Sequence, residues 1–151
     1  MASAVSDLDA HLGYWLRFVS NHVSQAFARL LQDKGVTVAE WVAMRRLFGE
    51  GGMAPSLLAD RIGMTRGAIT KLVDRLIDKG LVVRRADRRD GRAQTLALTA
   101  RGRALIPELA VLADVNDAEF FRPLTMHEQR TLRRLLGRLV EQNDLKTVPV
   151  D

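Results

Sequence analysis

The sequence contains no cysteine among its 151 residues. This excludes disulfide frameworks, zinc sites built on thiolates, iron–sulfur clusters and thiol-based sensing of peroxide. No run of the sequence approaches the ~20 apolar residues that a membrane span requires. The opening residues MASAVSDLDAH show neither the basic start nor the apolar core of a signal peptide. We therefore expect a cytoplasmic protein that does not bind a membrane and folds as one domain.

Motifs for catalysis and metal binding are also missing. The glycine cluster at residues 49–52 is not followed by the Gly-Lys-Ser/Thr of a phosphate-binding loop. Neither a G-x-S-x-G motif nor a paired set of acid and base occurs. His11 and His22 are about 16 Å apart along one helix, so only a second chain would bring two such histidines to one ion. We predict no enzymatic activity, no metal and no cofactor.

The positive charge is concentrated in the middle third of the chain. The net charge is +5, but residues 53–104 hold 12 basic and 5 acidic side chains, a net charge of +7. Residues 1–52 are neutral in sum, and residues 105–151 have a net charge of −2. Such a segment is typical of a protein that binds a polyanion. On charge alone, a basic surface kept for solubility is the alternative.

The spacing of apolar residues and the capping residues predict six helices and one β-hairpin. The helices cover approximately residues 7–34, 37–48, 55–62 and 65–79, followed by two that begin at Thr99 and Thr125. Capping boxes of the T-x-x-E type are expected at Thr37 with Glu40 and at Thr125 with Glu128. Two short strands at 81–84 and 95–98 are predicted, with an Asp-Gly turn between them.

The third and fourth predicted helices have the spacing of a helix-turn-helix. The turn at residues 63–65 contains a glycine, and in this motif the second helix lies in the DNA major groove. When the apolar stripe of the second helix is buried, its polar residues face outward. The predicted contacts to bases and phosphates are Thr65, Arg66, Gly67, Thr70, Lys71 and Arg75. The alternative is a core helix with a solvated face.

The loop between the two strands is rich in arginine. Its guanidinium groups repel one another unless a polyanion, or Asp87 and Asp90, offsets them. We expect Arg92 to enter a narrow minor groove, and Asp90 to orient it by a charge-assisted hydrogen bond. The alternative is an exposed turn with incidental charges. The candidate wing residues are Arg84, Arg85, Arg88, Arg89, Asp90 and Arg92.

These motifs together resemble the MarR family of winged-helix transcription regulators. The resemblance depends on the helix-turn-helix and on a D-x-R followed by L-x-L-T-x-x-G, matched here by Asp90, Arg92, Leu96, Leu98, Thr99 and Gly102. It departs at residues 88–89, where family members often have a proline or an acidic residue. The resemblance implies a mainly α (α+β) fold in one domain, 1–151. A winged helix-turn-helix lobe would span 36–99, flanked by dimerisation helices at 7–35 and 100–144.

The resemblance also implies a function. A MarR-like protein is expected to bind a palindromic operator in double-stranded DNA as a homodimer, to act as a repressor, and to be released by a small aromatic or anionic effector. Residues able to form an effector pocket are Tyr14, Trp15, Arg17, Trp41 and Arg46. Plain core or interface positions are the alternative for these aromatics. An interaction module that binds RNA or an acidic protein is the alternative function.

Overall fold

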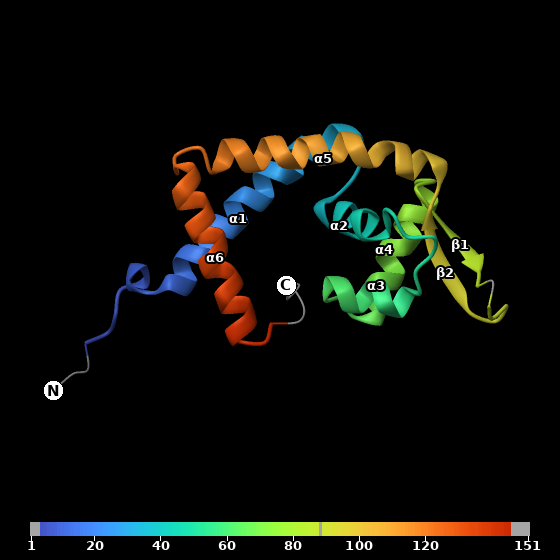
Figure 1. Ribbon diagram of the computed structural model, residues 1–151, viewed down its shortest axis with the longest axis horizontal. Helices are drawn as coiled ribbons and strands as arrows, with labels where there is room; N and C mark the ends of the chain where they lie inside the picture. The colour runs from blue at the N-terminus through green and yellow to red at the C-terminus, as the bar shows by residue number, and fades with distance from the viewer. Residues whose placement is uncertain (1–3, 88, 146–151) are drawn as a thin grey trace.

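The computed structural model describes residues 4–87 and 89–145. Within these residues the chain is mainly helical and contains one antiparallel β-hairpin, as predicted. The elements are η1 (Leu8–Ala10), α1 (Leu12–Leu31), η2 (Gln32–Lys34), α2 (Val38–Leu47), α3 (Pro55–Ile62), α4 (Arg66–Asp78), β1 (Val82–Ala86), β2 (Gln94–Leu98), α5 (Ala100–Phe120) and α6 (Met126–Gln142). Helix α5 runs along one side of the molecule, with the hairpin at its start and α6 at its end (Figure 1). None of the helices in these ranges is long and apolar enough to cross a membrane.

Threonine hydroxyls begin four of the helices. Each accepts the backbone N–H of the residue three positions later, at 3.0–3.2 Å, which satisfies a donor that the first helical turn leaves free. The four caps are Thr37, Thr65, Thr99 and Thr125. At Thr125 the capping box is complete, because Oε1 of Glu128 accepts the Thr125 N–H at 2.9 Å. These hydrogen bonds lower the pKa of Glu128 below its usual value.

The predicted helix at residues 7–34 is interrupted near its start. His11 has an extended backbone (φ −101°, ψ 123°), so η1 is separated from α1. The indole N–H of Trp15 donates to the carbonyl oxygen of Asp9 at 2.7 Å. A side-chain donor therefore satisfies a carbonyl that a continuous helix would pair with a backbone amide. The predicted end is confirmed, because Gly35 has the left-handed conformation (φ 69°) that terminates η2.

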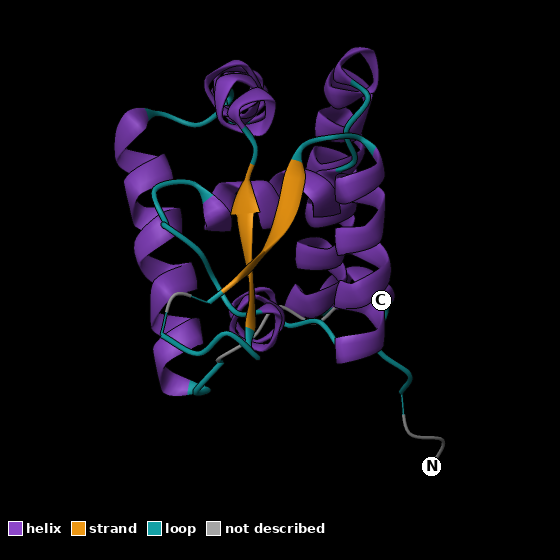
Figure 2. Cartoon of the chain, turned by 90° about the vertical axis from the view of Figure 1, so that its right-hand side faces the viewer, coloured by secondary structure: helices purple, strands orange, loops and turns teal. Residues whose placement is uncertain are grey.

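The first strand of the hairpin is longer than the pattern of apolar and polar side chains predicted. Strand β1 pairs with β2 from Val82 opposite Leu98 to Ala86 opposite Gln94, two residues beyond the predicted end of the first strand. The outer half of β1 is exposed and charged, so no apolar alternation indicates it, and only backbone pairing extends the strand. Met53 forms an isolated bridge with Leu96, which adds the connection before α3 to the sheet edge. Figure 2 shows the two strands at the side of the molecule that faces the viewer, in front of the helices.

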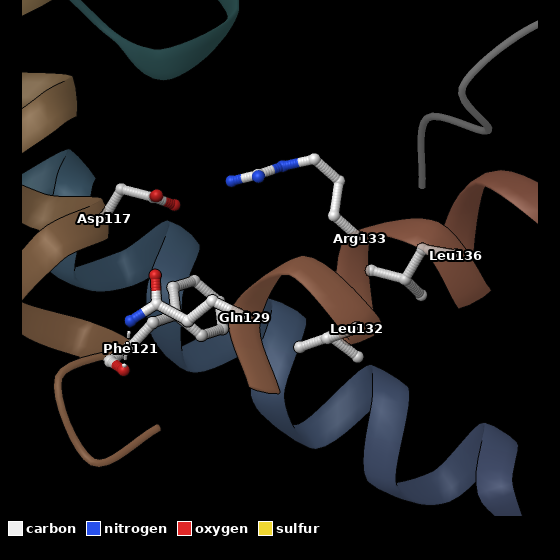
Figure 3. Close-up of a pocket in the computed structure, with 6 residues that line it drawn as sticks. All are labelled: Asp117, Phe121, Gln129, Leu132, Arg133 and Leu136. Carbon is white, nitrogen blue, oxygen red and sulfur yellow. Dashed lines mark hydrogen bonds between the residues drawn. The ribbon is translucent and has the colours of Figure 1, made fainter. Parts of the chain in front are cut away.

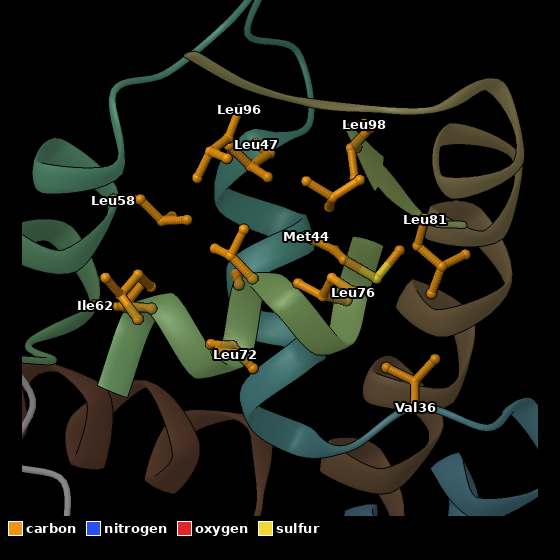
Figure 4. Close-up of a cluster of buried hydrophobic side chains, with 14 of the residues drawn as sticks. Val36, Met44, Leu47, Leu58, Ile62, Leu72, Leu76, Leu81, Leu96 and Leu98 are labelled. Carbon is orange, nitrogen blue, oxygen red and sulfur yellow. The ribbon is translucent and has the colours of Figure 1, made fainter. Parts of the chain in front are cut away.

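A single apolar core holds α2, α3, α4 and the hairpin together. Its buried side chains come from each of these elements (Figure 4). Leu31 of α1 and Ile106 and Leu109 of α5 belong to the same core. The end of α1 and the beginning of α5 are therefore fixed to this lobe. The opposite ends of both helices, together with α6, leave large apolar side chains exposed.

Candidate nucleic-acid interface

Helix α4 buries one face and exposes the other. Ile69, Leu72, Val73 and Leu76 are at most 2% exposed and pack against the lobe. Such a helix presents its polar face to solvent or to a ligand. The six residues predicted for the major groove are all exposed: Thr65, Arg66, Gly67, Thr70, Lys71 and Arg75.

The first turn of α4 forms the tip of this polar face. A helix N-terminus carries a partial positive charge and free N–H groups, both of which favour a phosphate. Two of the predicted contacts are already engaged within the turn. Thr65 accepts the N–H of Ala68 at 3.2 Å, and the Thr70 hydroxyl donates to the carbonyl of Arg66 at 2.8 Å. A base placed against Thr70 would therefore meet its hydroxyl as an acceptor, for which the amino groups of adenine and cytosine are suitable partners.

Gly67 provides a direct test of this surface. A Cβ built on Gly67 has no atom within 4 Å, so the missing side chain leaves room for something outside the chain. We expect Gly67→Ala to leave Tm unchanged or slightly higher, because alanine favours a helix by up to about 1 kcal/mol. We expect operator affinity to fall about tenfold as the backbone is held away from DNA. Gel shifts and thermal melts measure the two quantities.

Gly137→Ala is the matched control. Its added Cβ also meets nothing within 4 Å, and Gly137 lies on the polar side of α6 near Arg134 and Glu141. This variant should bind the operator like the wild type. Equal affinity of all three proteins would show that DNA does not approach Gly67 closely.

Arg84 connects the hairpin to α4. Its Nη2 donates to Oδ1 of Asp74 at 3.0 Å, and both side chains are exposed. Arg84 lies opposite Leu96 in the hairpin, so the two side chains share the face that looks toward the core and α4. Arg85, one residue later, lies on the other face, opposite Thr95. A contact of either arginine with DNA stays a prediction, and for Arg84 it requires sharing the guanidinium with Asp74.

The aspartates of the hairpin tip shape its backbone. Oδ1 of Asp87 accepts the N–H of Arg89 at 2.9 Å, and Oδ1 of Asp90 accepts the N–H of Arg92 at 3.0 Å. Asp90 was expected to orient the Arg92 guanidinium, whereas the described bond fixes the Arg92 backbone. Arg89 and Arg92 have exposed side chains. Arg88, also predicted to contact DNA, lies outside the described residues.

Two exposed arginines of residues 53–104 also form hydrogen bonds within the lobe. Arg101 donates from Nη1 to the carbonyl of Lys79 at 2.9 Å, and Arg103 donates to the carbonyl of Leu98 at 2.8 Å. Both carbonyls lie at junctions between elements, which composition cannot reveal. These two arginines join α5 to α4 and to the hairpin.

Glu40 was expected to complete a capping box, and that prediction is wrong. Thr37 accepts the Glu40 N–H, but the Glu40 side chain does not return to the Thr37 N–H. Its carboxylate is instead fully buried against the ammonium group of Lys79, with Oε1 2.9 Å from Nζ. Sequence spacing missed this pair because 39 residues separate its members.

The five residues predicted for an effector pocket fall into two groups. On α1, Tyr14 and Trp15 form an edge-to-face pair with ring centroids 5.6 Å apart, and both are exposed. Trp41 packs edge-on against Phe27, with centroids 6.3 Å apart. Tyr14 and Phe27 are separated by about 20 Å along α1. One chain therefore does not bring the first group, which includes Arg17, to the second, which includes Arg46.

A pocket that the sequence did not predict lies between α5 and α6. Its volume is about 170 Å³, and Phe121, Leu132 and Leu136 provide apolar walls. Asp117 and Arg133 face each other across it, while the Gln129 amide donates to the carbonyls of Phe121 and Leu124 (Figure 3). The pocket marks the corner where α6 turns away from α5.

Comparison with known proteins decides the family. Residues 34–93 match the model of the MarR family. The chain is 34% identical over 131 residues to the HTH-type transcriptional repressor Rv2887 of Mycobacterium tuberculosis, covering 87% of this chain and 94% of that protein. The chain belongs to the MarR family. The family assignment predicted from the wing motif is therefore confirmed.

Solved structures of MarR-family and related regulators share this fold. A probable transcriptional regulator from Pseudomonas aeruginosa has a TM-score of 0.80 and 34% identity, covering 88% of this chain and 99% of that one. A mutant of MarR from E. coli complexed with operator DNA has a TM-score of 0.79 and 25% identity, covering 85% and 93%. Rv2887 has been solved with DNA (TM-score 0.71, 30% identity, covering 85% and 97%) and with p-aminosalicylic acid (0.69, 31%, covering 85% and 98%). These relatives confirm that this MarR-family chain is a transcription regulator and not an enzyme.

Proposed function

We propose that this chain is a homodimeric repressor that binds a palindromic operator and is released by a small molecule. The observation that carries the proposal is the surface formed by α4 and the hairpin tip. Every residue predicted for the major groove is exposed on α4 or at its N-cap, and the exposed arginines of the tip belong to the hairpin that Arg84 connects to α4. This surface matches a helix in the major groove with an adjacent arginine in the minor groove. The operator lies on the genome, so the protein acts in the cytoplasm.

The proposal of a homodimer is supported by apolar surface at the ends of α1, α5 and α6. Large hydrophobic side chains are 39–59% exposed there, more than a folded chain leaves uncovered in one region without a partner. They include Trp15, Leu16, Phe18, Val111, Val115, Leu135, Leu136, Leu139 and Val140. A two-fold axis through this region buries both copies of each helix. The resulting dimer presents its two α4 helices to half-sites that lie about one turn of DNA apart.

The proposed effector is a small aromatic or anionic molecule. Rv2887 has been solved with p-aminosalicylic acid, which has both properties. In this chain, Trp41 and Arg46 both belong to α2. Tyr14, Trp15 and Arg17 lie on the half of α1 assigned to the dimer, so a second subunit is needed to bring the two groups together. Effector binding then requires only a difference in affinity between two subunit arrangements.

Selection of bound duplexes from a random library tests the proposal. We expect a palindromic consensus that is bound about 10³–10⁷-fold more tightly than random duplex. The affinity should also fall steeply with salt, because basic side chains release counterions from the phosphates. A protein that binds RNA or an acidic partner through the same surface would not prefer one duplex sequence over random duplex in this way. Screening aromatic carboxylates for release of the selected duplex then tests the effector.

Arg92→Ala is expected to weaken operator binding about tenfold without changing Tm. The side chain is exposed at the hairpin tip, and loss of one arginine from a narrow minor groove removes a favourable electrostatic contact. Arg122→Ala removes the same charge from the exposed corner between α5 and α6 and serves as the control. If both variants bound equally well in a gel shift, insertion of Arg92 would be refuted.

A further inference from the structure

Among the described residues, Glu40 is the only charged side chain that is fully buried, and it forms an ion pair with Lys79. Both carboxylate oxygens of Glu40 lie close to Nζ, at 2.9 Å for Oε1 and 2.8 Å for Oε2. Within the described residues, Oε2 has no hydrogen-bond donor of its own. Burying a carboxylate is unfavourable unless a charge compensates it. Lys79 is that charge, so Glu40 fixes where the Lys79 side chain lies.

Lys79 also binds the junction between α1 and α2. Its Nζ donates to the carbonyl oxygen of Gly35 at 2.8 Å, next to the left-handed turn that ends η2. The backbone carbonyl of Lys79 accepts from Arg101 of α5 at 2.9 Å. One residue at the C-terminal end of α4 therefore contacts α2, the α1–α2 junction and α5.

We propose that Lys79 and Glu40 are positioning residues that set the orientation of α4 for reading base edges. The inference rests on the proposed function, since it concerns sequence-specific binding. The apolar stripe of α4 holds the helix in the lobe, but apolar contacts are not directional. The two hydrogen bonds from Lys79 Nζ, to Glu40 Oε1 and to the carbonyl of Gly35, are directional, and they tie the end of α4 to α2 and to the α1–α2 junction.

Base contacts and phosphate contacts differ in their tolerance of a change in the orientation of α4. Base-edge hydrogen bonds need donors and acceptors placed to within about 0.5 Å, whereas a long basic side chain follows a phosphate over a larger range. Loosening α4 should therefore lower affinity for the operator and leave affinity for random DNA unchanged. A residue with a merely structural role would change Tm but not this ratio.

The test compares single and double variants of the full-length protein. Lys79→Met alone leaves the buried carboxylate unpaired and should lower Tm by about 10 °C. Lys79→Met with Glu40→Met removes both charges, and such replacements often restore stability. We expect the double variant to melt within a few degrees of the wild type and to keep the salt dependence of binding. Its ratio of specific to non-specific affinity should fall at least tenfold.

Lys34→Met with Glu108→Met is the matched control. It removes an exposed ion pair of 3.5 Å between η2 and α5, neither member of which belongs to α4. The control should keep the wild-type ratio. A double Lys79/Glu40 variant whose ratio stays within threefold of the wild type would overturn the inference. If that variant does not fold, Glu40→Gln decides in the same way, since it keeps the shape and removes the charge.

The wild-type protein separates the two hypotheses. A wild type that shows no preference for any duplex contradicts the proposed function. A wild type with a clear preference, together with an unchanged ratio in the folded double variant, contradicts only the positioning role of Lys79 and Glu40.

Discussion

Replacing Leu135 and Leu139 by glutamate is expected to convert the protein into monomers and to lower operator affinity by about 10²–10⁴-fold. The two side chains are 41% and 47% exposed and lie one helical turn apart on α6. In a two-fold interface, four new carboxylates would be buried together without partners. Loss of the second half-site removes the gain from linked binding, which accounts for the large factor.

The measurements are sedimentation at micromolar concentration and gel shifts with the selected duplex. Glutamate is a good helix former, so α6 should remain helical in far-UV circular dichroism. Leu57→Glu on α3 is the control for oligomeric state, because Leu57 is equally exposed, at 42%, on the DNA-binding lobe. A Leu135/Leu139 variant that still sediments as a dimer would place the interface on another face.

Gly102→Ala is expected to destabilise the fold by about 3 kcal/mol, which corresponds to a fall in Tm of about 6–12 °C. A Cβ at Gly102 would collide with the carbonyl oxygen of Leu81, a backbone atom that cannot rotate away. The same carbonyl accepts the N–H of Thr99, so moving it also disturbs the cap of α5. In the Gly102→Ala variant, the first turn of α5 must therefore shift away from the connection between α4 and β1.

Thermal melts of Gly102→Ala and Gly67→Ala at one protein concentration test this prediction, because the stability of a dimer depends on concentration. Both substitutions add one methyl group near the start of a helix, but a Cβ at Gly67 meets nothing within 4 Å. The expected results are opposite: loss of stability at Gly102 and loss of DNA affinity at Gly67. Equal melting temperatures would mean that α5 packs less tightly on Leu81 than the structure indicates.

The sequence predicted those features that depend on neighbouring residues. The threonine caps, the turn at Gly63 and the buried stripe of α4 each follow from local spacing, and the structure confirms them. The exposed face of α4 follows from the same stripe. Gly102 was recognised as part of a family motif, but only the structure shows its close contact with Leu81.

Features that depend on distant residues were not predictable from spacing. Glu40 has the sequence position of a capping residue, yet its carboxylate pairs with an ammonium group contributed by another helix. Arg101 and Arg103 are exposed, and the sequence does not show that both also donate to backbone carbonyls of other elements. The break at His11 depends on a contact of Trp15 with a carbonyl six residues earlier. Each of these requires the folded chain to bring donor and acceptor together.

The length of helix α5 and its attachment at one end affect how motion passes between α6 and α4. The helix is fixed at its first turn to the end of α4, by Arg101 and by the cap at Thr99, and its far end leads to α6. A helix of 21 residues is about 31 Å long, so a tilt of about 5° at one end displaces the other by roughly 3 Å. That displacement equals the length of a hydrogen bond. In the proposed dimer, the helix would act as a lever arm, so that subunit rotations of a few degrees would take α4 out of register with the bases.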